Sequence, residues 1–150
     1  MPTPDSDSRY CTFVVAGLHF GLDVLKVQEV LRWQEMTTVP RAPKVVSGLL
    51  NLRGQIVTAI DLRTRLGLGD TDRPERPMNV VARASDATVS LLVDSVGDVV
   101  APPPNAWEST PVNLRGPLQE LSDGVYKSDG QILIILDLER VLDIDLSPSS

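Results

Sequence analysis

Two aspartates at matching positions of a repeated segment are the first candidates for catalysis. Asp61 and Asp137 each end a run of mostly apolar residues, and two carboxylates that share one proton can act as acid and base in peptide hydrolysis. That chemistry needs a small residue and a glycine directly after each aspartate, whereas the chain has Leu62-Arg63 and Leu138-Glu139 there. We therefore expect both aspartates to end a strand and to cap the turn or helix that follows. A small hydrolase is the least favoured function.

No other residues supply the parts of a catalytic, cofactor or metal site. His19 is the only histidine and Cys11 the only cysteine, so neither a disulfide nor a cysteine-based zinc site can form within the chain. The sequence has no G-x-x-x-x-G-K-[ST] loop and no G-x-G-x-x-G segment, the glycine patterns that hold nucleotide phosphates. We expect a protein that is not an enzyme, needs no cofactor and buries Cys11 as a small hydrophobe.

Arg53 suggests a different chemistry, the recognition of another protein. It stands between Leu52 and Gly54, where two apolar runs are split. A guanidinium held at such a turn can make a forked contact with a carboxylate or with backbone carbonyls of a partner. The alternative is an arginine that joins two parts of this chain, and the spacing alone favours neither.

Short strands must position these side chains. Four runs rich in β-branched residues form two hairpin signals, which are Tyr10–Ala16 with Leu18–Val24 and Met78–Ala84 with Ala87–Val93. Residues 69–77 are polar and form the best linker, and residues 101–117 hold five of the twelve prolines. Because proline removes a hydrogen bond from a strand ladder, residues 101–117 are expected to be a long surface loop. The pattern predicts a mainly β fold with a few short helices.

An internal repeat determines the expected architecture. Residues 54–62 (GQIVTAIDL) align with residues 130–138 (GQILIILDL), and a fainter match joins residues 27–30 (VQEV) to residues 96–99 (VGDV). Two copies indicate two similar β subdomains, about residues 10–70 and 76–145, and units of roughly 60–70 residues bury too little surface to be stable alone. We expect them to share one core within a single domain, as separate or strand-exchanged barrels, between disordered tails at residues 1–9 and 146–150.

The composition excludes several classes of partner. The chain has 150 residues and a net charge of −6, which disfavours nucleic acid because that affinity comes mainly from neutralising phosphates. The same charge disfavours anionic membrane surfaces. No apolar run approaches the roughly 20 residues that span a bilayer, and the N-terminus lacks the positive and apolar regions of a secretion signal. We expect a cytoplasmic protein that does not insert into membranes.

Four short motifs are spread along the chain. The most specific is residues 48–54 (GLLNLRG), followed by residues 60–63 (IDLR). The others are residues 25–30 (LKVQEV), 92–99 (LVDSVGDV) and 124–139 (GVYKSDGQILIILDLE). In this order they resemble the chemotaxis coupling protein (CheW) family, whose signature is G-x-x-N-L-R-G followed by D-L-R. The likeness covers about Tyr10 to Leu142, with Thr58 standing where the family usually has proline.

The resemblance implies two intertwined, five-stranded SH3-like barrels and a non-enzymatic adaptor. Its implied partners are the regulatory domain of a CheA-like chemotaxis histidine kinase and the cytoplasmic tip of methyl-accepting chemoreceptors. These partners would hold the protein in receptor arrays at the inner face of the membrane. The alternative is a coupling module of a chemosensory-like pathway with an output other than motility, which the sequence does not separate from the first.

The resemblance also implies a partner-binding surface made of six residues, which are Val27, Glu29, Gly48, Asn51, Leu52 and Arg53. Glu29 matches an acidic position of the family's receptor-contact region, and Val27 and Gly48 would line a groove for a receptor helix tip. Simpler alternatives are a solvated Glu29, a core Val27 and a Gly48 that ends a helical turn over residues 44–47. We expect Arg53 and Glu29 to face different partners, and the alternative is that they contact each other within this chain.

Overall fold

The computed structural model describes residue 4, residues 7–85 and residues 87–144. The expected tails, residues 1–9 and 146–150, fall largely outside this part. Arg9 lies within it, and its carbonyl accepts a hydrogen bond from the Val24 amide at 3.0 Å. The described residues form eleven strands with a few short helices. The prediction of a mainly β fold with little helix is therefore confirmed.

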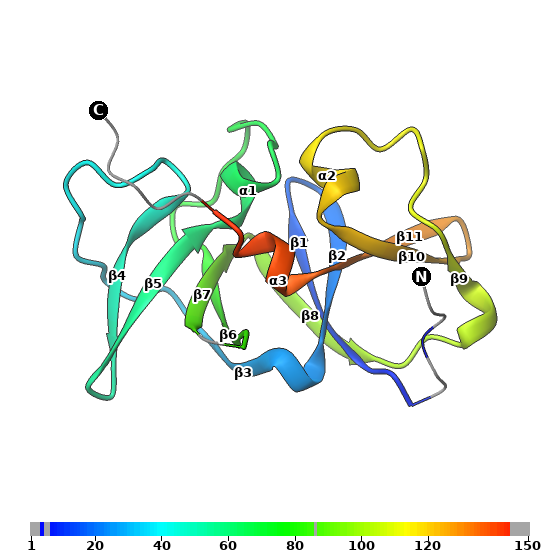
Figure 1. The fold of residues 1–150 in the computed structure, drawn as a ribbon, viewed down its shortest axis with the longest axis horizontal. Helices are drawn as coiled ribbons and strands as arrows, with labels where there is room; N and C mark the ends of the chain where they lie inside the picture. The colour runs from blue at the N-terminus through cyan, green and yellow to red at the C-terminus, as the bar shows by residue number, and fades with distance from the viewer. Residues whose placement is uncertain (1–3, 5–6, 86, 145–150) are drawn as a thin grey trace.

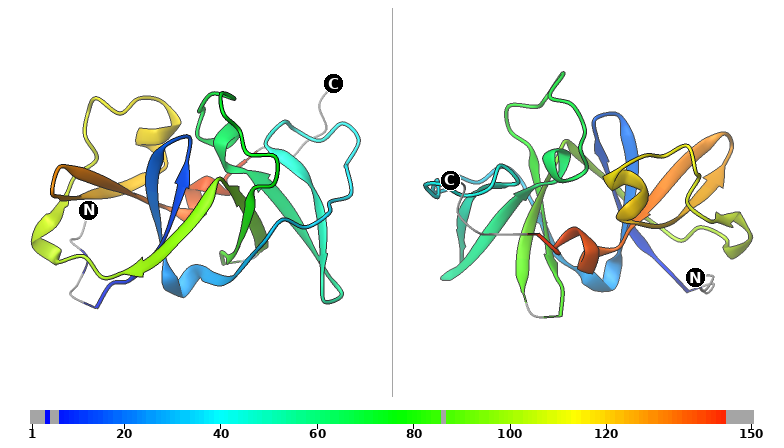
Figure 2. Two further views of the ribbon diagram at one scale, coloured as in Figure 1. Left: turned by 180° about the vertical axis from the view of Figure 1, so that it is seen from behind. Right: turned by 45° about the horizontal axis from the view of Figure 1, so that its top comes forward.

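The strands form two mixed sheets that lie side by side (Figures 1 and 2). The first sheet has the order β8 (Ser95–Val100), β1 (Tyr10–Val15), β2 (Leu18–Asp23), β11 (Gln131–Leu136), β10 (Ser122–Ser128) and β9 (Trp107–Glu108). The second has the order β3 (Val27–Leu31), β6 (Met78–Arg83), β7 (Thr88–Val93), β5 (Gln55–Asp61) and β4 (Val46–Leu52). The first sheet has six strands rather than the expected five, because two residues of the proline-rich loop pair with β10 as an edge strand.

Each sheet takes strands from both halves of the chain. After β2, the short helix η1 (Val24–Lys26) leads into β3, which leaves the first sheet and pairs with β6 of the second. In the same way, β8 follows β7 but pairs with β1 of the first sheet. The exchange is reciprocal, so neither half completes a sheet by itself. The division near residues 10–70 and 76–145 stays a prediction.

The repeat in the sequence is also a repeat in the structure. The β4–β5 and β10–β11 hairpins both turn through two residues with positive φ: Arg53 at 53° and Gly54 at 87°, and Asp129 at 51° and Gly130 at 79°. Two successive residues with positive φ make a type I′ turn, whose twist matches that of the strands. β5 then pairs in parallel with β7, and β11 pairs in parallel with β2.

Each repeat ends in a helical turn capped by an aspartate, as the sequence predicts. Asp61 begins α1 (Leu62–Arg65), and its Oδ1 accepts from the Thr64 amide at 3.3 Å. Asp137 begins α3 (Leu138–Val141), and its Oδ1 accepts from the Arg140 amide at 3.3 Å. The remaining short helices are η2 (Pro104–Ala106) and α2 (Pro117–Glu120).

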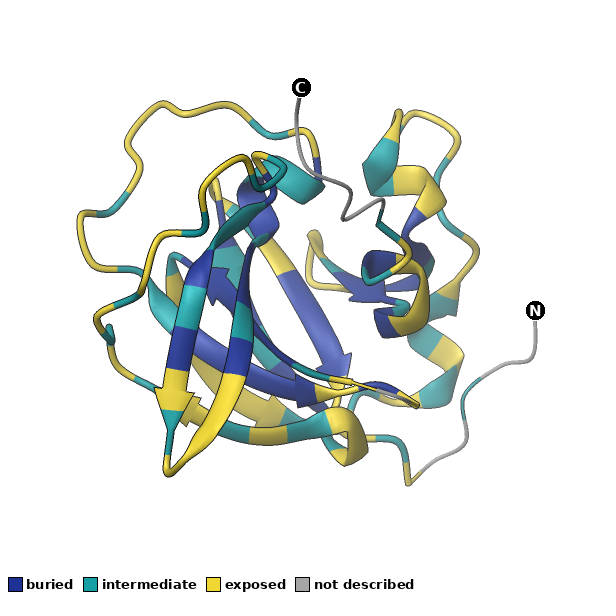
Figure 3. Cartoon of the chain, turned by 60° about the vertical axis from the view of Figure 1, so that its left-hand side comes forward, coloured by how far each residue is buried: buried dark blue, intermediate teal, exposed yellow. Residues whose placement is uncertain are grey.

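One large apolar core lies between the sheets and draws on both halves of the chain. Its fully buried members include Phe13, Phe20, Leu22, Leu62, Val80, Leu91, Val125 and Val141. Burial is concentrated on the strands, while loops and hairpin tips are exposed (Figure 3). At roughly 1.5–3 kcal/mol for each large apolar side chain removed from water, this shared core is the main source of stability and holds the hairpins rigidly.

Two glycines let the chain close around the sheets. After β3 the chain crosses to the free edge of β4, where Thr37 pairs with Leu49 through hydrogen bonds of 2.9 and 2.8 Å. A Cβ on Gly48 would stand 2.8 Å from the Thr37 carbonyl oxygen. At the matching position of β10, a Cβ on Gly124 would stand 2.4 Å from the ring of Trp107 in β9. Both glycines are therefore required for close approach of the crossing chain.

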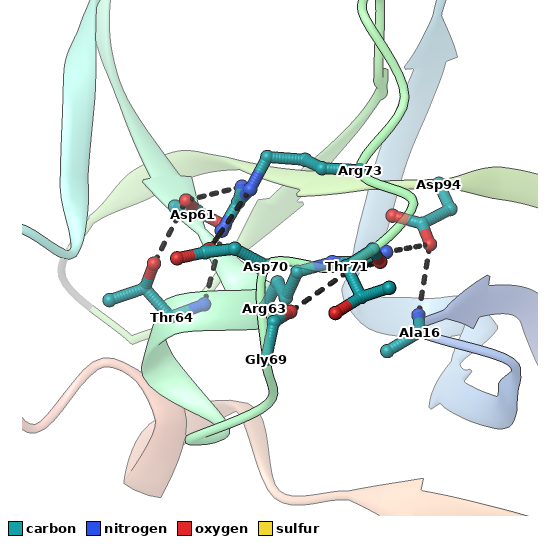
Figure 4. A network of polar contacts seen from close by, with 9 residues as sticks. All are labelled: Ala16, Asp61, Arg63, Thr64, Gly69, Asp70, Thr71, Arg73 and Asp94. Atoms are coloured by element: carbon teal, nitrogen blue, oxygen red, sulfur yellow. Dashed lines mark hydrogen bonds and ion pairs between the residues drawn. The ribbon is translucent and has the colours of Figure 1, made fainter.

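A buried arginine ties the end of one sheet to a turn of the other. Arg63 in α1 is only 3% exposed, and its Nη2 donates to Asp94 Oδ2 at 2.5 Å. The same carboxylate oxygen accepts from the Ala16 amide in the β1–β2 turn at 2.9 Å (Figure 4). Nη1 of Arg63 donates to the carbonyls of Gly69 and Thr71 at 2.9 and 2.8 Å. The polar segment 69–77 is thus anchored to the body of the protein.

The second half makes an equivalent connection with the opposite charge. Glu139 stands in α3 at the repeat position of Arg63, and its Oε1 accepts from the amide of Ser85 at 3.0 Å and from its hydroxyl at 2.7 Å. These two hydrogen bonds hold the pKa of Glu139 below its usual value. Ser85 lies in the β6–β7 turn, so each capping helix is linked to a turn of the sheet that it does not follow.

We expect Gly48→Ala to destabilise the fold, because overpacking a close contact costs about 1–3 kcal/mol. Gly69→Ala is the control, since a Cβ there meets nothing within 4 Å and its carbonyl bond to Arg63 is kept. Urea unfolding monitored by tryptophan fluorescence gives both free energies of unfolding. Equal values for the two variants would show that the approach of Thr37 to β4 does not restrict position 48.

Arg63→Met is expected to lower the free energy of unfolding more than Arg73→Met does. Removing one member of a buried ion pair leaves the other charge uncompensated, which costs about 3 kcal/mol or more. Arg73 is 36% exposed in its own ion pairs, and exposed pairs contribute about 0–1 kcal/mol. The same unfolding measurement compares them. If Arg63→Met lowers the free energy of unfolding no more than Arg73→Met does, the contact between Arg63 and Asp94 does not hold the two halves together.

Candidate functional site

Arg53 and Glu29 form an ion pair between Nη2 and Oε2. Arg53 lies at the tip of the β4–β5 hairpin and Glu29 in β3, and these elements belong to opposite edges of the second sheet. The arginine side chain is 70% exposed and the glutamate 21% exposed. The expectation that they face different partners and not each other is wrong for the free chain, because the wrapping of the sheet brings its two edges together.

Arg53 occupies an unusual backbone position. Its φ of 53° is disfavoured for a residue with a long side chain, and type I′ turns prefer asparagine, aspartate or glycine there. The β10–β11 turn follows this preference with Asp129-Gly130. A side chain that is kept despite strained backbone geometry is a functional candidate.

Asn51 and Leu52, the last two residues of β4, stabilise this turn. The Asn51 Oδ1 accepts from the Gly54 amide at 3.0 Å, which fixes the turn. Leu52 is half-buried and packs on a small apolar cluster that contains Leu50 and Val57. The two residues therefore hold the backbone of Arg53 in place while its guanidinium faces solvent.

Val27 and Gly48 lie further from the hairpin tip. Val27 begins β3 and is half-buried against the shared core. Gly48 is buried within β4 under Thr37, and the alternative of a helical turn over residues 44–47 is wrong, because no helix forms there. Residues 43–46 instead make a turn closed by a 2.9 Å bond from the Val46 amide to the Pro43 carbonyl. Of the six predicted site residues, the structure thus brings Arg53 into contact with Glu29 and uses Gly48 for chain packing.

A small cavity of about 200 Å³ lies beside the buried Arg63 and includes Trp33, Asp61 and Arg73 in its lining. Arg73 Nη1 donates to Asp61 Oδ2 at 2.8 Å, and Arg73 Nη2 donates to Asp70 Oδ1 at 2.7 Å (Figure 4). The hydrogen bond from Arg73 lowers the pKa of Asp70, and the pKa of Arg73 is raised in turn.

Asp61 and Asp137 do not form a dyad. Asp61 already accepts from the Thr64 amide, the Thr64 hydroxyl and Arg73. Asp137 caps α3 in the other half and pairs with Arg140 at 3.3 Å. Within residues 4, 7–85 and 87–144, no group of three or more His, Cys, Asp or Glu side chains could hold a metal ion. No helix of the same residues is long and apolar enough to cross a membrane.

Sequence reasoning missed three residues that shape this region: Arg63, Asp94 and Gly124. In the sequence, Arg63 and Asp94 stand out only as parts of motifs. Each directly follows a strongly apolar strand or its cap, where burying a charge is unfavourable in free energy unless the charge is paired. Gly124 stands at the same repeat offset from Gly48 as Gly130 does from Gly54. That offset was a usable signal for a shared packing requirement. Trp107 packs at the edge of the Tyr126 ring, with centroids 5.0 Å apart, so it is a structural aromatic within this chain.

Comparison with known proteins agrees with this geometry. The chain is 29% identical over 142 residues to "Chemotaxis protein CheW" of Bacillus subtilis, covering 95% of this chain and 91% of the relative. It is 31% identical over 132 residues to "Chemotaxis protein CheW" of Thermotoga maritima, covering 88% and 85%. It is also 28% identical over 126 residues to "Protein FrzA" of Myxococcus xanthus, covering 75% of each chain.

A solved structure and a family model extend the match to the whole fold. The crystal structure of the scaffolding protein TtCheW from Thermoanaerobacter tengcongensis superposes with a TM-score of 0.81 at 26% identity, covering 92% of this chain and 94% of that one. The model of the CheW-like domain matches residues 9–145. With the strand exchange and the signature hairpin both in place, the chain belongs to the family of CheW-like domains.

Proposed function

We propose that this protein couples chemoreceptors to a chemotaxis histidine kinase through the surface around Arg53. One partner is the cytoplasmic tip of a methyl-accepting receptor, and the other is the regulatory domain of a CheA-like kinase. The protein would work in the cytoplasm, held at receptor arrays by these partners. The observation that carries the proposal is an exposed guanidinium kept in a backbone position that turn chemistry reserves for other residues.

Membership of the CheW-like family makes the chain a scaffold-type coupling protein of chemotaxis and not an enzyme. Its contribution to signalling must therefore come from binding free energy alone. A scaffold shifts a kinase between active and inactive arrangements only as far as it contacts the two differently. A rigid hairpin suits that role, because a binding group fixed in advance loses little entropy when the partner docks.

The Glu29 pairing prepares Arg53 for recognition. An ion pair this exposed contributes only about 0–1 kcal/mol to folding, so stability does not explain it. Holding the long side chain in one direction reduces the entropy lost on binding, and the guanidinium still has free N–H donors for a partner carboxylate or carbonyl. The neighbouring Ile56 is 61% exposed and would add apolar contact next to the charge.

Arg53→Glu is expected to reduce receptor-dependent kinase activation to the level without receptor. Placing a like charge against Glu29 and against an acidic partner costs roughly 2–5 kcal/mol of binding, while the fold changes little. Arg83→Glu is the matched control, because Arg83 is an exposed cation of β6 outside the site and none of the ion pairs within the described residues involves it. Activity of a reconstituted receptor–kinase complex and thermal melts are measured for both.

The double variant Arg53→Glu with Glu29→Arg separates two versions of the proposal. Restored activation would mean that the pair acts by shaping the surface, because the ion pair re-forms with its direction reversed. Failure to restore activation, with normal melting, would mean that a partner contacts Arg53 directly. If Arg53→Glu unfolds the protein, or leaves activation equal to that of Arg83→Glu, the site is assigned wrongly.

A further inference from the structure

The second half of the chain contains a structural counterpart of the Arg53–Glu29 site with different charges. Asp129 occupies the position of Arg53, since each is the first residue of a two-residue turn with positive φ. Asp98 occupies the position of Glu29. Val27 opposite Ala82 in the second sheet corresponds to Val96 opposite Phe13 in the first, and the acidic residue follows two positions later in each strand.

The register around Asp98 supports this correspondence. In β3, Glu29 pairs with Val81 after an irregularity in the ladder. In β8 the ladder is irregular at the same place, and the Asp98 carbonyl accepts from the Thr12 hydroxyl at 2.6 Å. Thr12 is the repeat counterpart of Val81. The two acidic residues therefore occupy the same place on the two crossing strands.

The change of charge leaves the second site without an internal ion pair. Two aspartates cannot form the ion pair that an arginine and a glutamate form. Among the described residues neither Asp98 nor Asp129 takes part in an ion pair. Both side chains lie on an exposed surface, so a partner can reach them.

A groove of about 510 Å³ lies at this edge of the first sheet, where Asp129 forms part of its wall. We call it the acidic groove. Much of its lining is apolar and comes from two segments, with Val100, Pro102, Pro103 and Ala106 on one side and Ile132 and Leu133 on the other. Ile132 is 40% exposed there. The prolines supply a rigid apolar wall without amide donors.

We infer that the acidic groove binds a peptide segment of a partner protein in which an arginine or lysine is flanked by apolar residues. The apolar lining would take the flanking side chains, and Asp129 in the wall of the groove would take the cation. Charge complementarity selects this occupant, because Asp129 attracts a cation and repels an acidic segment, and Asp98 on β8 adds negative charge to the same sheet. In the first half Arg53 supplies the cation from within the chain; in the second half a partner supplies it.

The probe is a fluorescein-labelled peptide, Ser-Pro-Leu-Arg-Ile-Pro-Gly-Ser, with a matched peptide that carries glutamate in place of arginine. Fluorescence anisotropy measures binding to the full chain, and amide shifts in two-dimensional NMR locate it. We expect the arginine peptide to bind with shifts at Asp129 and Ile132, and the glutamate peptide not to bind. Affinity is expected to fall as salt is raised, since exposed charges are screened.

Asp98→Asn with Asp129→Asn is expected to weaken binding by roughly tenfold or more, because asparagine keeps the shape and also tolerates positive φ. Asp72→Asn is the control: Asp72 is another exposed aspartate with positive φ, at 57°, outside the groove. It is expected to leave binding unchanged. The test uses neither receptor nor kinase, so it is independent of the proposed coupling role.

Several outcomes would overturn the inference. Equal binding of both peptides would show that the groove responds to apolar character alone. Absence of binding, or shifts confined to another surface, would show that no basic segment docks there. Self-association of the unlabelled chain in sedimentation, abolished by the double asparagine variant, would show that a second copy and not a separate partner occupies the groove.

Discussion

The reciprocal exchange of β3 and β8 is the constraint on which the rest of this structure depends. Each strand leaves the sheet of its own hairpin and completes the other sheet, so neither half can bury its apolar face alone. The paired helical turns then reinforce the exchange: Arg63 reaches the β1–β2 turn through Asp94, and Glu139 reaches the β6–β7 turn through Ser85. The two halves must consequently fold as one cooperative unit.

A scaffold needs this rigidity, because its surface does its work without chemistry. After the exchanged strand β3, the chain runs along the free edge of β4, where Thr37 approaches Gly48 closely. This path curls the second sheet, so that Arg53 at one edge contacts Glu29 at the other. The ion pair is therefore a consequence of how the sheet wraps. An exposed pair could not create that geometry, but once formed it directs a long, otherwise mobile side chain.

Local chemistry explains what the sequence could predict. The hairpins, the capping role of Asp61 and Asp137 and the mainly β fold follow from short-range patterns. The Arg53–Glu29 contact does not, because it joins opposite edges of one sheet and depends on the path of residues 32–37. Gly48 was open to a helix-ending reading because glycine serves both turns and close approaches. Only the position of Thr37 in the structure shows that Gly48 serves a close approach and not the end of a helix.

Duplication gives the protein two edges of the same shape, and the charges placed on them make the edges different. A partner that recognises the guanidinium at the first edge meets a carboxylate at the corresponding point of the second, where it is repelled. Two turns of the same type thus carry opposite charges at their first positions, Arg53 in one and Asp129 in the other. For an adaptor whose task is to hold different proteins in a fixed relation, this difference in charge is a simpler route to specificity than a difference in fold.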